Sequence, residues 1–116
     1  MVLRLAFHDA GTYDKTDGVG GANGSIQFEL NPTERPESFG LKRGWRSIEA
    51  ALEGIKGTPA EGLVGAADMV QLAAAYAVRE SGGPAIPVRV GRVDADAADP
   101  TNRMLPEDAA VDAQRA

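Results

Sequence analysis

The chain has 116 residues, of which 43% are apolar and 25% charged, an ordinary composition for one globular domain with a modest core. Its net charge of −5 and its 5% aromatic content exclude a basic or stacking surface for nucleic acid, and the absence of cysteine excludes disulfides and thiolate metal sites. No apolar run approaches the roughly 20 residues that a transmembrane segment needs.

The first predicted element is a short helix followed by loops. Apolar side chains recur at helical spacing and a glycine follows the last turn: Leu3, Phe7, Ala10 and Gly11. The glycine-rich stretch 11–25 and the acidic, proline-bearing stretch 29–40 are both typical of irregular loops.

Two longer helices follow. The second has apolar residues every three or four positions and ends before a Gly and a Pro: Leu41, Trp45, Ile48, Leu52, Ile55, then Gly57 and Pro59. The third is predicted over residues 66–80, and its inner face is expected to consist of Met69, Leu72, Ala73, Tyr76 and Ala77. Residues 84–93 are expected to be extended, with at most one short strand. The sequence therefore predicts an all-α chain whose helices are joined by long ordered loops.

Both ends of the sequence have a helical pattern without a normal boundary. No capping residue precedes the helical run that begins at Met1, and residues 108–116 are helix-prone but contain no terminating Gly or Pro. We therefore expect residues 1–116 to be a single partial domain, truncated at both ends.

One residue pair could carry chemistry. Arg4 and His8 are one helical turn apart, so they share a face, about 6 Å apart along the axis, with the apolar Phe7 beside them. A neutral imidazole can take a proton from a peroxide and return it to the departing oxygen, while a guanidinium stabilises the charge that develops there. For the pair taken alone, a structural role for His8 is the simpler interpretation.

The surrounding motifs point to a family. Residues 3–14, which include Arg4, Phe7 and His8, resemble the distal helix of class I haem peroxidases. Six further segments are similar to ascorbate peroxidases and occur in the same order: 20–26, 41–56, 67–73, 81–84, 90–94 and 103–106. The resemblance implies the all-α haem peroxidase fold, of which this chain is the N-terminal, distal part.

The resemblance also implies roles for individual residues. His8 corresponds to the distal acid–base catalyst, and Arg4 to the arginine that assists O–O cleavage. Phe7 lies at the position of the distal aromatic residue over the haem, and Pro106 falls where the family lines the haem edge.

A second set of residues corresponds to supporting positions. Asp68 and Arg92 match a structural ion pair. Ser38 occupies the position of an Asn whose carbonyl normally accepts the distal His Nδ1–H, and Glu29 matches a Glu that supports this network. Because a Ser side chain is shorter, the support of the distal histidine stays open, with Asn31 as an alternative.

The chain supplies only part of a haem site. His8 is its only histidine, and the family's proximal iron ligand belongs to a later helix that this sequence lacks. We expect haem b in the parent protein, not ligated by this chain alone, and no metal site within the chain. The EF-hand spacing fails for Asp94, Asp96 and Asp99, so no calcium loop is expected there, and Asp9 is interpreted as structural.

Two functions from different classes follow from this resemblance, and whether the chain belongs to an active enzyme stays open. The first is a haem peroxidase that reduces hydrogen peroxide with a small organic donor such as ascorbate, in defence against oxidative stress. The alternative is a non-catalytic, peroxidase-like structural or binding subunit of a larger assembly, for example in the thylakoid. Either implies that the rest of the domain, or a protein partner, covers an exposed face. The expected location is the chloroplast, in stroma or thylakoid, or the cytoplasm.

Overall fold

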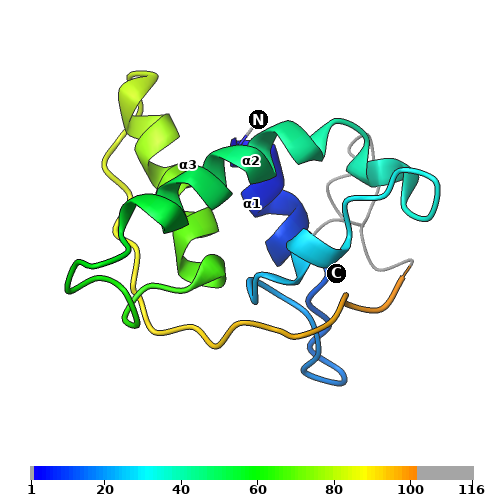
Figure 1. The fold of residues 1–116 in the computed structure, drawn as a ribbon. Helices are drawn as coiled ribbons and strands as arrows, with labels where there is room; N and C mark the ends of the chain where they lie inside the picture. Colours follow the sequence, from blue (N-terminus) through cyan, green and yellow to red (C-terminus); the bar gives the residue numbers. More distant parts are fainter. Residues whose placement is uncertain (1, 102–116) are drawn as a thin grey trace.

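Three α-helices dominate residues 2–101, the part of the chain that the computed structural model describes. They are α1 (Val2–Ala10), α2 (Leu41–Gly54) and α3 (Ala66–Glu80), and two short 3-10 helices lie in the loops, η1 (Ser25–Phe28) and η2 (Pro36–Ser38). Each α-helix contacts the other two (Figure 1). Within this range the only β pairing is an isolated bridge between Asp14 and Val19. The predicted all-α class is confirmed.

The helix boundaries agree with the sequence signals to within a few residues. Helix α3 has the predicted bounds, and α2 ends at Gly54, before the predicted terminators. Residues 84–93 are extended and, within the described range, form no strand. The loops 11–25 and 29–40 are more regular than predicted, because η1 begins at the end of the first and η2 lies within the second.

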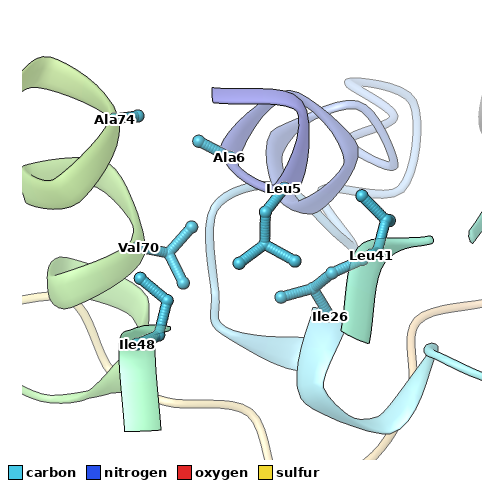
Figure 2. Close-up of a cluster of buried hydrophobic side chains, with 7 residues drawn as sticks. All are labelled: Leu5, Ala6, Ile26, Leu41, Ile48, Val70 and Ala74. Carbon is cyan, nitrogen blue, oxygen red and sulfur yellow. The ribbon is translucent and has the colours of Figure 1, made fainter. Parts of the chain in front are cut away.

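One cluster of buried apolar side chains joins the three helices to η1. Its members point toward a common centre from all four elements (Figure 2): Leu5, Ala6, Ile26, Leu41, Ile48, Val70 and Ala74. Trp45 and Leu52 are partly buried and pack against this cluster. The predicted inner face of α2 is therefore confirmed.

The predicted inner face of α3 is confirmed only in part. Met69 and Ala73 pack against the core as expected. Val70 and Ala74 enter the core, whereas Tyr76, which the sequence placed inside, is 64% exposed. Helix α3 is rich in alanine and carries apolar residues on adjacent faces. Periodicity identifies such faces but does not say which of them receives a partner.

An extended segment, residues 84–101, passes below the start of α3 and is called the strap here (Figure 1, yellow to orange). Gly65, which precedes α3, offers no side-chain cap. Instead the Asp94 carboxylate of the strap accepts the N–H groups of Ala66 and Ala67 at 2.9 and 2.8 Å. A carboxylate at this end of a helix satisfies free N–H groups and complements the helix dipole. The strap thus caps α3 from a distance in sequence.

Candidate functional site

Arg4 and His8 lie one turn apart on α1, and Arg4 is fixed by main-chain carbonyls. Its Nη1 donates to Phe39 O at 2.6 Å and its Nη2 to Glu37 O at 3.0 Å. The guanidinium therefore extends from α1 to the loop that contains η2, and two hydrogen bonds from adjacent nitrogens fix the plane of the group.

His8 and Phe7 differ sharply in accessibility. His8 is only 3% exposed, whereas the neighbouring Phe7 is 51% exposed. The two rings meet edge to face, with centroids 5.9 Å apart and planes at 71°. The imidazole is therefore held within the protein in this conformation, and a small molecule reaches it only when the groups that cover it move.

An apolar groove of about 300 Å³ lies between α1, α3 and the strap. It is lined by Leu3, Ala6, Phe7, Ala10, Gln71, Ala74, Ala75, Val78, Ile86 and Val88. Neither Arg4 nor His8 lines it. At about 100° per residue, Phe7 lies about 40° from Leu3 and about 60° from Arg4 around the helix. The groove is therefore on a different side of α1 from the Arg4–His8 pair, and Phe7 lies at the border between the two.

The supporting residues expected around His8 are arranged differently. Ser38 is buried, and its backbone N–H donates to Arg35 O at 2.9 Å. Among residues 2–101 the structure has no hydrogen bond between Ser38 and His8. Glu29 is also buried, but it accepts hydrogen bonds from Ser25 Oγ at 2.5 Å and from the Asp99 N–H at 3.0 Å. Asn31, the alternative support, instead accepts the Thr33 N–H through its own side chain.

These contacts form a buried polar junction next to α1. We use this name for Asp9, Thr12, Ser25, Glu29, Arg35 and Asp99. Arg35 Nη1 lies 3.2 Å from Glu29 Oε1, and Arg35 Nη2 donates to the Asp99 carbonyl. The Asp99 carboxylate accepts Thr12 Oγ1–H at 2.5 Å. No buried polar side-chain atom within the described residues lacks a partner.

Asp9, next to His8 in the chain, is the residue of this junction whose pKa is raised. Burial raises its pKa to about 6, and the nearby Glu29 and Asp99 carboxylates add to the rise. The backbone N–H groups of Gly24 and Ile26, at 2.9 and 3.2 Å, act in the opposite direction. Asp9 therefore ties α1 to the start of η1, a structural contact.

Asp68 and Arg92 form an ion pair between α3 and the strap. Arg92 Nη1 lies 3.1 Å from Asp68 Oδ1, and the backbone N–H groups of Gly91 and Arg92 also donate to this carboxylate. Burial by itself raises the pKa of Asp68, but these hydrogen bonds and the guanidinium charge outweigh it and lower the pKa below its ordinary value. The pair fastens the strap to the helices.

Several important residues gave no local signal in the sequence. Arg35 and Asp99 are 64 positions apart, yet they meet in the polar junction. Asp94 caps α3 from the strap.

Pro106, expected at the haem edge, lies outside the described residues. Within residues 2–101 no group of three or more His, Cys, Asp or Glu could hold a metal ion, and none of the helices there has the length and apolar character of a membrane span.

The comparisons with known sequences agree on one family. The model of the family described as peroxidase matches residues 1–116. L-ascorbate peroxidase 5, peroxisomal, of Arabidopsis thaliana is 50% identical over 101 residues, which cover 85% of this chain and 33% of that protein. A relative with the name "Putative L-ascorbate peroxidase 6", from the same plant, is 44% identical over 106 residues, covering 91% of this chain and 30% of the relative. The chain thus spans about a third of the length of these curated relatives.

A solved structure has a similar fold. The crystal structure of the TL29 protein from Arabidopsis thaliana matches with a TM-score of 0.66 and 34% sequence identity, covering 90% of this chain and 52% of that one. Other relatives have chloroplastic names, for example L-ascorbate peroxidase T of Arabidopsis thaliana, which is 36% identical and of which the chain covers 25%.

Proposed function

Because the chain belongs to the peroxidase family, we propose that the protein carrying it is a haem-dependent enzyme that reduces hydrogen peroxide with a small donor such as ascorbate, in defence against oxidative stress. Residues 1–116 form the distal half of its peroxidase domain, and the activity resides in the longer polypeptide. The observation that supports this proposal best is the Arg4–His8 pair, one turn apart on α1 of a chain that the family matches from end to end.

The residues present fit one side of haem b. Helix α1 offers a cation, an aromatic ring and an imidazole from Arg4, Phe7 and His8. His8 is the only histidine of the chain and, as the proton-transfer group, cannot also ligate the same iron. The residue that would ligate the iron is therefore expected in polypeptide outside residues 1–116. Pro106, outside the described residues, would contribute to the haem pocket. Haem, when bound, supplies the redox chemistry of peroxide cleavage.

The two polar side chains of α1 divide the work. His8 takes the proton from one peroxide oxygen and delivers it to the departing one, which leaves as water. Arg4 stabilises the negative charge on the departing oxygen before that proton arrives. Since His8 is buried, access of peroxide requires a local movement of the groups that cover it.

The test uses the complete, haem-loaded protein and follows its absorption spectrum after peroxide is added. His8→Leu is expected to slow the spectral change by about 10²-fold or more, because general acid–base catalysis contributes about 10²–10⁴-fold. Arg4→Leu is also expected to slow it, while Arg46→Leu on the exposed face of α2 provides the matched control. An unchanged rate in His8→Leu would remove this residue from the mechanism.

A second candidate function is supported by the surroundings of His8. The burial of His8, together with a serine at position 38 where the family has an asparagine, suits a non-catalytic, peroxidase-like structural or binding subunit of a larger assembly, such as one in the thylakoid. In that case the complete protein, separated from free haem after incubation with it, shows no haem absorption band. A haem absorption band that responds to peroxide would exclude this alternative.

The proposal extends to partners and location. The apolar groove between α1 and α3 supports our inference that the remainder of the domain, or a protein partner, covers this face. The names of relatives include both chloroplastic and peroxisomal proteins, and we place the parent protein in the chloroplast or the cytoplasm. Imaging of a fluorescent fusion of the complete protein tests the location, and exclusively peroxisomal fluorescence would contradict it.

A further inference from the structure

The turn that leads into α2 holds the Arg4 guanidinium. Two hydrogen bonds of Arg4 end on main-chain atoms of this short region, Glu37 O and Phe39 O. Carbonyl oxygens bear partial negative charge and favour a charged donor. Their positions depend on the backbone conformation of the turn, not on the identity of the side chains.

The conformation of this turn depends on a glycine. Phe39 has φ −53° and ψ 124°, and Gly40 has φ 83° and ψ −7°, which are the central dihedral angles of a type II turn. The second position of such a turn requires positive φ, which glycine adopts at little cost. In the alternative type I turn, the peptide between the two central residues is rotated by about 180°. The Phe39 carbonyl then points away from Arg4.

The polar junction anchors the other end of the turn. The Arg35 carbonyl accepts the Ser38 N–H at 2.9 Å, and the Arg35 side chain is held by Glu29 and by the carbonyl of Asp99. The turn is thus fixed at one side by a buried ion pair and at the other by the left-handed conformation of Gly40.

We propose that residues 37–41, which contain the type II turn at 38–41, are a positioning element for Arg4, and that Gly40 sets the direction of the carbonyl that holds its Nη1. The catalytic consequence rests on the proposed function, whereas the positioning does not. Each hydrogen bond limits the directions in which a guanidinium can point, so loss of the bond to Phe39 O is expected to give Arg4 more freedom. Small displacements of a group that stabilises a transition state lower rates strongly.

The first experiment reads the position of Arg4 without any catalysis. Solvent exchange of the Arg4 Nη–H protons is measured by NMR in the folded protein, with the signals assigned from their loss in Arg4→Leu. Gly40→Ala is expected to speed this exchange at least fivefold, because Ala disfavours positive φ. Gly40→Asn is expected to retain slow exchange, since Asn tolerates this conformation.

A matched control separates positioning from general strain. Gly57 also has positive φ, 80°, and a Cβ added there would meet open space, so Gly57→Ala imposes a similar backbone strain far along the chain from Arg4. Exchange at Arg4 is expected to stay within twofold of the original protein in Gly57→Ala. Equal acceleration in Gly40→Ala and Gly57→Ala, or none in Gly40→Ala, would overturn the proposal.

The second experiment measures the peroxide reaction of the complete, haem-loaded protein in a double-mutant cycle. Gly40→Ala is expected to lower the rate constant about tenfold in the original background and less than twofold in the Arg4→Leu background, because the turn acts through Arg4. A tenfold loss in both backgrounds would overturn the positioning role. If the original protein does not react with peroxide at all, the proposed function fails while the exchange measurement still decides the role of the turn.

Discussion

The two flanks of α1 are built in opposite ways. On one flank Leu5 is fully buried in the core and Asp9 is tied to the backbone of η1. On the other, Leu3 and Phe7 line a groove and are half-exposed. Both flanks are part of one nine-residue helix. The difference shows that the described part of the chain completes the surroundings of α1 on one side only.

The flank of α1 that carries Leu5 and Asp9 is held largely by the polar junction. This junction joins α1, η1, the loop before α2 and the strap through residues far apart in sequence. Such a network is strong only while every member is satisfied, since an unpaired buried charge is costly. Among the described residues the open flank offers mainly apolar surface, with one polar contact from Gln71 Nε2 to Ala6 O at 3.4 Å. The predictions below test whether the flanks differ in energy as they do in structure.

The largest expected effect comes from breaking the polar junction. Glu29→Ala removes the partner of the buried Arg35 guanidinium, so the free energy of unfolding is expected to fall by about 3–5 kcal/mol. Urea denaturation measures this loss. Glu53→Ala, which breaks the exposed Glu53–Lys56 pair of α2, serves as the control and should leave the midpoint unchanged. Similar losses in both variants would mean that the junction has no special weight.

The same substitution on the two flanks gives the next largest contrast. Leu5→Ala creates a cavity in the core and is expected to cost about 3 kcal/mol of unfolding free energy. Leu3→Ala is expected to cost well under about 1 kcal/mol, because Leu3 is 55% exposed. Denaturant midpoints of the two variants measure the difference directly. A costly Leu3→Ala would show that the groove is filled in solution.

The pH dependence of stability offers a third test. Since folding raises the pKa of Asp9 from 3.8 to about 6, the native state binds the proton more tightly than the unfolded one. This group therefore adds stability as the pH falls from about 7 to 4, by at most about 3 kcal/mol. Asp9→Asn is expected to abolish this rise. Unfolding curves at pH 7 and 4.5 measure it, and an unchanged rise in Asp9→Asn would assign it to another group.

The contribution of Asp68 to stability changes with pH in the opposite direction to that of Asp9. Its folded pKa is lowered, so its contribution is present above the unfolded value of 3.8 and disappears as the pH falls through the folded value. Asp68→Asn is therefore expected to destabilise the protein at pH 7, with a deficit that shrinks in acid below pH 3.8. A deficit that is constant with pH would indicate that hydrogen bonding, and not charge, fastens the strap.

The smallest effect on stability is expected in the groove. Leu3→Lys replaces an exposed apolar side chain, so the unfolding free energy should change by no more than about 0.5 kcal/mol. Binding of a hydrophobic dye is nevertheless expected to fall, since this side chain lines the groove. Leu63→Lys changes an exposed leucine that is not among the lining residues and is expected to leave dye fluorescence unaltered. Equal decreases would show that the groove does not concentrate the dye.

Local sequence signals determined the helices. The alternation of apolar and polar residues defined α2 and its buried face, and the glycines and proline after Glu80 marked the end of α3. The Arg4–His8 spacing followed from helical geometry alone. These predictions succeeded because they depend on neighbours three or four residues apart, which the helix itself brings together.

Resemblance to the family also predicted contacts between residues far apart in sequence, which helical periodicity does not reveal. It pointed to an ion pair between Asp68 and Arg92, which the structure places 3.1 Å apart. It also indicated Ser38 as the residue that would support His8. Within residues 2–101, however, the structure has no hydrogen bond between Ser38 and His8.

Tertiary structure alone decided which apolar faces are covered and how the distant polar groups meet. Tyr76 lies outside and Val70 inside although both fit a helical face, because only the packing of α1 and α2 selects one. The Arg35–Asp99 contact and the cap that Asp94 provides to α3 depend on the path of the strap. Such contacts require closure of long loops, and the sequence encodes them only through the sum of many weak interactions across the fold.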